Sequence, residues 1–275
     1  GRRSVHCGVW ACEGMNRAEK ATLQLRACAF LGMLKRSRTY EELAAETAIP
    51  AGDLNRYVNG HVLPGVDRAE RIIAELAPPV LEAELRRRIT IDTEGYVDNS
   101  GVVYDRQFLE LVAPVAAMTM DAPDADVVLT AATDGITTAC AMAAHLDAEV
   151  VYAKQTRETA VDAFIESRQR LRSGIELTYY LPADAIGPGA SVLIVDDLIR
   201  SGETQTVLLD IAEQAAATVL GMYALIAVGD DGLAETRALT TAPVEALWHL
   251  PAPSHPLEPR SYTPPPQPTQ RQAEN

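Results

Sequence analysis

Two adjacent acids stand at the end of an apolar run and have the clearest chemical meaning in the chain. Asp196 and Asp197 follow residues 192–195, and the next few residues, 200–204, include a serine, a glycine and a threonine. Such a turn, opening a helix, presents free backbone N–H groups that suit a phosphate. Two carboxylates beside a phosphate would repel it unless they bind sugar hydroxyls or magnesium. The pattern therefore predicts a site for a phosphorylated ribose.

Alternating strand-like and helix-like segments must position these residues. The strand-like segments are residues 125–131, 149–155, 175–181, 190–197 and 218–228, and the helix-like segments are 104–118, 136–146 and 204–217. This alternation predicts an α/β fold, with a parallel doubly wound sheet and helices on both faces. Ligands of such sheets bind at the carboxyl ends of the strands. Asp196 and Asp197 are expected at such an end and outside the core.

The segment around the two acids resembles the signature of the type I phosphoribosyltransferases, and residues 175–204 are similar to adenine phosphoribosyltransferases. The resemblance covers roughly residues 105–250. It implies that Asp196 and Asp197 hold the ribose hydroxyls of 5-phosphoribosyl-1-pyrophosphate (PRPP), directly or through Mg2+. It also implies a cradle for the 5′-phosphate, made of Arg200, Ser201, Gly202, Glu203 and Thr204.

Two further stretches match the family in part. Thr133, Asp134 and Gly135 take the place of its pyrophosphate loop, and Lys154 that of a basic catalytic residue. The alternative for Lys154 is a solvated charge at a strand end. Residues 156–174 would be a closing loop whose arginines meet the leaving diphosphate, or an amphipathic helix with exposed arginines; these arginines are Arg168, Arg170 and Arg172.

One departure from the family bears on catalysis. Adenine enzymes have an arginine where this chain has Asp134. An acid that faces a diphosphate needs magnesium between them, so the departure argues for weak turnover or a different loop geometry. The family's Gly- and Lys-rich closing loop is also missing, which leaves the choice of base open.

The N-terminal part of the chain has a helical pattern. Thr39 and Glu42 form a capping box, so a helix should begin at Tyr40 and end near Thr47. A turn at residues 49–50 precedes a further helix that ends before Gly60. This layout resembles a repressor-like helix-turn-helix. The resemblance directs Leu54, Tyr57 and Val58 inward and leaves Asn55, Arg56 and Asn59 to contact bases, with His61 near a phosphate. The alternative is a four-helix dimerisation or docking unit.

Composition narrows the class of protein. The chain has 275 residues, a formal net charge of −14 and four scattered cysteines, which do not suit a disulfide framework. Residues 17–75 carry nine Lys or Arg against eight Asp or Glu, so the acidity lies elsewhere. No apolar run reaches the roughly 18 residues of a membrane span. We therefore expect a cytoplasmic protein without a membrane partner.

The boundaries follow from these patterns. We expect a disordered leader at 1–14, a small all-α helix-turn-helix domain at 15–77, a linker with short hood strands at 78–104, a phosphoribosyltransferase domain at 105–250 and a disordered Pro-rich tail at 251–275.

Two functions fit this organisation. The first is a transcriptional regulator of purine metabolism, homodimeric on double-stranded DNA, which senses PRPP or a nucleotide and resembles the bacterial purine repressors. The second is a salvage enzyme that transfers the phosphoribosyl group from PRPP to a nucleobase. The fusion and Asp134 favour the regulator, whereas Lys154 and the intact signature keep the enzyme open.

Overall fold

The computed structural model describes residues 15–92, 96–120, 124–170, 174 and 176–252. The expected leader at 1–14, most of the expected tail at 251–275 and Arg172 lie outside the described residues.

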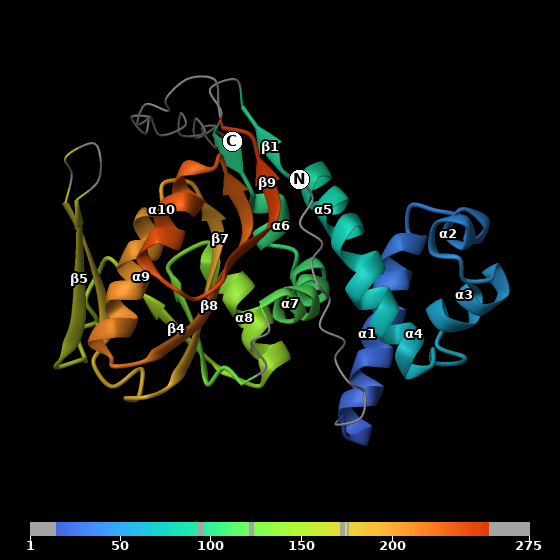
Figure 1. Cartoon of the computed structure of the whole chain (residues 1–275), viewed down its shortest axis with the longest axis horizontal. Coiled ribbons are helices and arrows are strands. Elements are labelled where there is room, and N and C mark those ends of the chain that lie inside the picture. The colour runs from blue at the N-terminus through green and yellow to red at the C-terminus, as the bar shows by residue number, and fades with distance from the viewer. Residues whose placement is uncertain (1–14, 93–95, 121–123, 171–173, 175, 253–275) are drawn as a thin grey trace, which may run out of the picture.

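A five-stranded parallel sheet forms the centre of the α/β part (Figure 1). Its strands, in spatial order, are β4 (Glu149–Ala153), β3 (Val127–Ala131), β7 (Ser191–Ile199), β8 (Thr218–Val228) and β9 (Val244–Leu250). Every neighbouring pair is parallel, so the expected parallel sheet is confirmed. The predicted alternation of strands and helices ended at residue 228. In the structure it continues with helix α10 (Asp231–Leu239) and strand β9.

Alternate residues of strand β7 face two separate cores. Leu193 and Val195 pack into the core beneath α7 (Arg106–Met120) and α8 (Gly135–Leu146). Val192 and Ile194 pack into the opposite core, with α9 (Glu203–Gln214) and α10. Because successive strand side chains point to opposite faces, an unbroken apolar run indicates a strand covered on both sides. Helices therefore cover both faces of the sheet.

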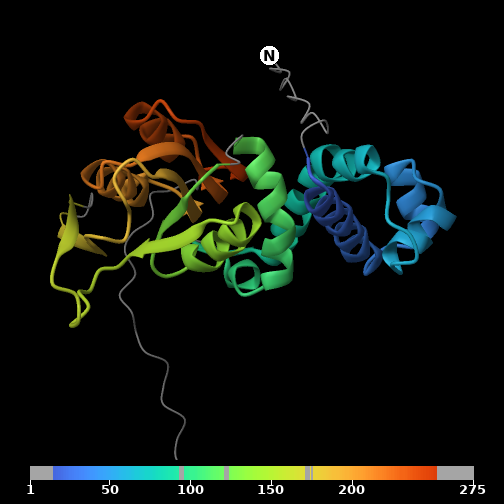
Figure 2. The same ribbon diagram turned by 90° about the horizontal axis from the view of Figure 1, so that it is seen from below.

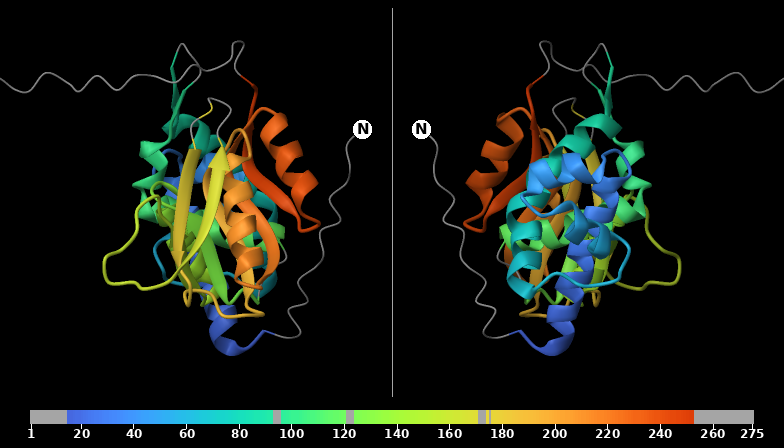
Figure 3. Two further views of the ribbon diagram at one scale, coloured as in Figure 1. Left: turned by 90° about the vertical axis from the view of Figure 1, so that its left-hand side faces the viewer. Right: turned by 90° about the vertical axis from the view of Figure 1, so that its right-hand side faces the viewer.

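A separate antiparallel hairpin stands beside α9 (Figure 3). It consists of β5 (Phe164–Arg170) and β6 (Glu176–Pro182). The Gln214 side chain of α9 donates a 3.1 Å hydrogen bond to the carbonyl oxygen of Glu166 in β5. The alternative of an amphipathic helix is therefore wrong for residues 164–170, and the segment predicted to close over the ligand contains a strand at these residues. Seven successive cross-strand pairs hold them as a strand.

Four helices begin the described chain: α1 (Arg17–Lys35), α2 (Tyr40–Thr47), α3 (Ala51–Val58) and α4 (Val66–Arg71). The capping box is confirmed, because the Thr39 hydroxyl accepts from the Glu42 N–H at 3.2 Å and the Glu42 carboxylate accepts from the Thr39 N–H at 2.7 Å. Left-handed Ala48, with φ of 53°, ends α2. Helices α2 and α3 are thus joined by a three-residue turn, residues 48–50.

The helical run continues where the sequence reading placed a connection. A π-helical turn, η1 (Ile72–Leu76), leads directly into α5 (Ala77–Arg88). Pro78 and Pro79 lack N–H groups and would clash with carbonyls one turn earlier in an α-helix interior. They are tolerated because they stand in the first turn of α5, after the wider π-helical turn. Residues 77–88 therefore form a helix and not a linker.

One hydrophobic core joins the N-terminal helices to the sheet. Phe30 of α1, Leu81 of α5, Phe108 of α7 and Leu193 of β7 are all buried in the same cluster. Figure 2 shows α7 between the sheet and the first helices. A hairpin of β1 (Thr90–Ile91) and β2 (Val97–Asp98), followed by α6 (Ser100–Val103), links α5 to α7. Among the described residues, no helix is both long and apolar enough to cross a membrane.

Candidate functional site

The turn between β7 and α9 lines a cavity. Its volume is about 340 Å³, and it is formed by residues 200–205 together with Leu198, Tyr96 and Val97. The predicted phosphate cradle, Arg200, Ser201, Gly202, Glu203 and Thr204, thus faces one cavity. Tyr96 and Val97, at the start of β2, also line the cavity, although they stand about one hundred residues before the turn in the sequence.

Gly202 sets the shape of this turn. It caps α9 in the left-handed conformation, with φ of 74°. A Cβ at this position would lie 3.0 Å from the Thr236 hydroxyl oxygen and 3.1 Å from the Gly232 carbonyl oxygen. The twelve-residue helix α9 begins immediately afterwards, so its first backbone N–H groups lie in the cavity wall. A residue with a side chain would disturb both the turn and its packing on α10.

The two acids differ in environment. Asp196 is 6% exposed and accepts hydrogen bonds from the Gln205 side chain at 2.6 Å and from the Asp197 N–H at 3.0 Å. Asp197 is half-buried and accepts from the Asn99 side chain. The expectation that both acids lie outside the core is wrong for Asp196, since β7 continues to Ile199 and α9 covers it. Asp197 is therefore the more accessible carboxylate.

Charge is concentrated around the acids. Burial, followed by the nearby Asp197, raises the pKa of Asp196 well above its ordinary value. Burial and Asp197 also raise the pKa of Asp134. Burial lowers the pKa of Arg200, whose Nε is buried without a hydrogen-bond partner in the described part of the chain. The Arg200 guanidinium lies 5.9 Å from the centre of the Tyr96 ring. These groups prefer a ligand that brings opposite charge to each.

The β3–α8 loop meets the two acids. The Ala132–Thr133 peptide is cis, Thr133 and Asp134 are exposed, and Gly135 begins α8. A Cβ on Gly135 would lie 2.9 Å from an Asp196 carboxylate oxygen and 2.3 Å from the Thr130 hydroxyl oxygen. Only glycine allows this approach, so the start of α8 lies directly against Asp196.

Lys154 follows β4 and is already paired. Its backbone exchanges two hydrogen bonds with Tyr180 of β6, at 3.0 and 2.7 Å, and its Nζ pairs with Glu158. The hydrogen bond to Glu158 raises the pKa of Lys154. Lys154 would have to leave Glu158 to reach a ligand. Of the loop's arginines, Arg168 is exposed on β5.

The four residues expected to contact DNA lie at the surface on and after α3. Asn55, Arg56, Asn59 and His61 are exposed, whereas Leu54 and Tyr57 are buried. Arg56 pairs with Asp53 at 2.6 Å, and Asn59 donates to Asn55 at 2.6 Å. The surface formed by these four residues is polar and exposed to solvent.

Sequence reasoning missed the residues that surround the motif. Tyr96 and Val97 line the cavity, Asn99 holds Asp197, and Gln205 holds Asp196. Gln205 could have been noticed as the polar residue that follows the signature. Asn99 stands 98 residues from Asp197 in sequence, and no local pattern connects them.

Comparisons with known proteins agree with this geometry. No family model matches the chain. It is 40% identical over 72 residues to an adenine phosphoribosyltransferase of Salinispora tropica (26% of this chain, 37% of that protein) and 33% identical over 112 residues to one of Bifidobacterium longum (41% and 56%). It is 26% identical over 133 residues to the purine biosynthesis transcriptional repressor PurR of Bacillus subtilis (48% and 47%). The chain thus spans about half or less of the length of these relatives.

Solved structures give the fold. The adenine phosphoribosyltransferase of Rhodothermus marinus superposes with a TM-score of 0.55 at 23% identity, covering 62% of this chain and 99% of that one. The enzyme of Thermoanaerobacter pseudethanolicus gives 0.55 at 17% identity, covering 61% and 99%. The chain therefore has the type I phosphoribosyltransferase fold of the adenine enzymes, and its sequence is similar both to those enzymes and to a purine repressor.

Proposed function

We propose that the chain binds PRPP at the β7–α9 turn and uses it as a signal in the regulation of purine metabolism. The observation that carries this proposal is the 340 Å³ cavity, into which the signature residues 200–204 face beside Asp196 and Asp197. The resemblance to the phosphoribosyltransferase signature and the similarity to PurR support it.

The turn supplies what a phosphate monoester requires. The start of α9 offers backbone N–H groups and the positive end of the helix dipole. Ser201 and Thr204 add hydroxyl donors, and Arg200 adds a positive charge whose Nε has a hydrogen bond to give. We assign the 5′-phosphate to this turn.

The acids divide the remaining work. Asp197 is the more accessible member of the pair and would accept hydrogen bonds from ribose hydroxyls. Asp196 accepts from the backbone N–H of Asp197 and from Gln205, so it positions its neighbour. The diphosphate would lie along the β3–α8 loop, at Thr133, Asp134 and Gly135.

The fold implies Mg2+ bound together with PRPP. The described residues contain no group of three or more His, Cys, Asp or Glu that could hold a metal ion by themselves. Burial, and after it the charge of Asp197, raise the pKa of Asp134, and a cation between the two acids would relieve their repulsion. These two acids fit a Mg2+ ion that takes its other ligands from the diphosphate, where it neutralises charge.

DNA binding completes the regulator. Helices α2 and α3, joined by residues 48–50, present Asn55, Arg56, Asn59 and His61 outward from a core that holds Leu54 and Tyr57. This is how a recognition helix is used in helix-turn-helix proteins. The region is also close to neutral in an acidic chain. Such readers act as dimers on double-stranded DNA, so we propose a homodimer.

The second candidate is a purine phosphoribosyltransferase, and two sequence features favour it: the intact signature and Lys154 at the end of β4. In that reaction the bond from the ribose C1 to diphosphate breaks and a bond to a base nitrogen forms. Asp134, an acid in the pyrophosphate loop, and Lys154, tied to Glu158, both weigh against fast turnover.

One titration separates the two functions. Calorimetry with PRPP and Mg2+ is repeated with each purine base while released pyrophosphate is assayed. Binding without pyrophosphate supports the regulator, and pyrophosphate with one base supports the enzyme. Asp197→Asn should abolish PRPP binding. Asp184→Asn, at an exposed acid in the connection between β6 and β7, should not. Undiminished PRPP affinity in Asp197→Asn would refute the assignment of this site.

A further inference from the structure

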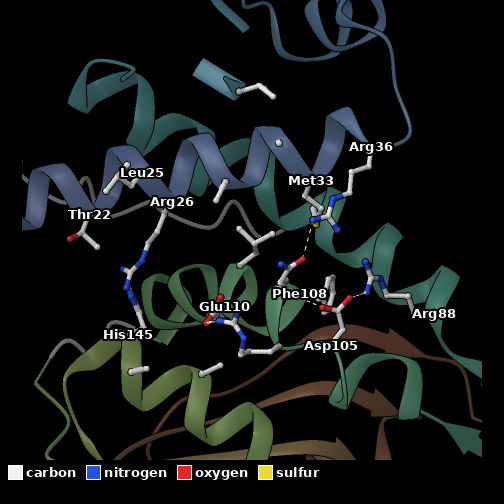
Figure 4. Close-up of a pocket in the computed structure, with 18 residues that line it drawn as sticks. Thr22, Leu25, Arg26, Met33, Arg36, Arg88, Asp105, Phe108, Glu110 and His145 are labelled. Atoms are coloured by element: carbon white, nitrogen blue, oxygen red, sulfur yellow. Dashed lines mark hydrogen bonds and ion pairs between the residues drawn. The ribbon is translucent and has the colours of Figure 1, made fainter. Parts of the chain in front are cut away.

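A second, larger cavity lies between the first helix and the α/β part. Its volume is about 770 Å³, and residues of α1, α7 and α8 form most of its wall (Figure 4). It shares no residue with the cavity at the β7–α9 turn. Volumes of 300–1,000 Å³ are typical of small-molecule sites.

Positive charge in this cavity exceeds negative charge. Its acids are Asp105 and Glu110, and each is already paired, Asp105 with Arg88 and Glu110 with Arg106. Two further cations of the wall, Arg26 and Arg36, have no acidic partner in the part of the chain that the structure describes. Arg36 donates only to the neutral Gln107 side chain, at 3.0 Å.

Arg26 is the most distinctive of these cations. It makes no hydrogen bond or ion pair with any described residue, and its guanidinium extends from α1 toward His145 of α8 (Figure 4). The His145 Nδ1 is buried and also lacks a hydrogen-bond partner among the described residues. Burial, and then the charge of Arg26, lower the pKa of His145 to about 3. Two nitrogen-bearing side chains thus face each other with no acceptor between them.

The rest of the wall is suited to the body of an organic molecule. Leu25, Met33, Phe108 and Leu111 line the same cavity, and Leu25 is 58% exposed there. An isolated cation that is partly withdrawn from water is unfavourable unless an anion joins it. An apolar surface beside unpaired cations describes a small organic anion.

We propose that this cavity binds a small anionic metabolite, with its phosphate or carboxylate between Arg26 and His145 and its apolar part on Leu25, Met33 and Phe108. The ligand would join α1 to α8, across the junction between the N-terminal helices and the sheet. Helix α8 also starts at the β3–α8 loop, about 18 Å away by its twelve residues, so its two ends would face different ligands.

Binding is tested by calorimetry on the full chain, with adenosine monophosphate, citrate and inorganic phosphate as probes. Adenosine monophosphate represents the phosphates and citrate the carboxylates, and inorganic phosphate tests the charge without an apolar body. We expect Arg26→Gln to weaken the organic probe that binds by about tenfold or more, the effect of removing a charged hydrogen bond. Arg71→Gln, an exposed arginine of α4 outside the cavity, is the matched control.

Two further measurements separate this site from the β7–α9 turn and from a structural role. The binding should persist in Asp197→Asn, and the ring signals of His145 should shift on titration. Arg26→Gln should melt no lower than the unchanged protein without ligand, because it removes an uncompensated charge. The proposal is overturned if no probe binds in an Arg26-dependent way. It is also overturned if Arg26→Gln lowers the melting temperature and leaves binding unchanged, since Arg26 would then only stabilise the end of α8.

Discussion

The side-chain amide of Gln205 donates a 2.6 Å hydrogen bond to the buried carboxyl group of Asp196. This bond ties the first turn of α9 to β7 directly behind the phosphate turn. Both side chains are almost completely buried, at 2% and 6% exposed. The Asp196 carboxyl group has no water to replace a lost partner.

Gln205→Leu should therefore lower the free energy of unfolding by about 1–3 kcal/mol, because it leaves a buried polar group unpaired. Urea unfolding of the pure protein measures the change. Gln214→Leu makes the same substitution at an exposed position of the same helix. It also removes a hydrogen bond, to the Glu166 carbonyl oxygen, but water can take the place of that partner, so we expect a change within about 0.5 kcal/mol. Equal effects of the two substitutions would contradict a special role for Gln205.

Asp196→Asn should change how stability depends on pH. The folded-state pKa of Asp196 is raised above its ordinary 3.8, so the folded protein holds this proton more tightly than the unfolded chain. Its contribution to stability is complete below pH 3.8 and is lost as pH rises through the folded-state pKa. Asparagine has no such loss, and the Gln205 amide can turn to accept from it. Urea unfolding from about pH 4 to about pH 8 should show that the free energy of unfolding of the variant rises relative to that of the unchanged protein as pH rises. A fall in the variant's free energy of unfolding, relative to that of the unchanged protein, as pH rises would refute this explanation.

Gly202→Ala should disturb the phosphate turn. Its φ of 74° is unfavourable for alanine, and the added Cβ would press on Thr236 and on the Gly232 carbonyl. We expect a loss of about 1–2 kcal/mol in stability from the left-handed backbone, with weaker PRPP binding. Gly187→Ala, where a Cβ meets nothing within 4 Å and φ is not positive, is the control. Urea unfolding measures the stability of both variants, and calorimetry measures their affinity for PRPP. Unchanged PRPP affinity in Gly202→Ala would show that the turn is not part of the binding site.

Arg56→Ala should weaken binding to an operator by about 1–3 kcal/mol if α3 reads bases. Arg87→Ala is the matched control. Arg56 pairs with Asp53 on α3, and Arg87 pairs with Glu84 on α5. Both ion pairs measure 2.6 Å, join residues three apart and leave the guanidinium exposed. A fragment selected from random duplex DNA serves as the operator, and the salt concentration is fixed. If both variants lose affinity equally, α3 is not the reading helix.

Local chemistry accounts for what could be predicted from the sequence. The capping box at Thr39, the doubly covered β7 and the turn at residues 200–204 each depend on neighbouring residues, so their patterns are legible. The predicted linker after residue 77 was wrong because two successive prolines, here Pro78 and Pro79, usually mark the end of a helix. Only the π-helical turn before them allows the helix to continue.

The remainder depends on contacts between distant segments. Nothing near Asp197 indicates that Asn99 will hold it, and nothing in residues 164–170 shows that they pair with β6. The burial of Asp196 likewise follows from α9 folding over β7. The cavity beside Arg26 arises only when α1 meets α7 and α8, so a pattern confined to one helix cannot reveal it.

The shared core links thermodynamically the parts that the two proposals treat separately. Phe30, Leu81 and Leu193 belong to one cluster, so helices α1 to α5 gain or lose that packing together with the sheet. A ligand that binds only the folded chain, at 100 times its dissociation constant, adds about 2.7 kcal/mol to the stability of everything in that unit. Ligand binding in either cavity would then make α3 more resistant to heat and to proteases, although α3 contacts neither ligand.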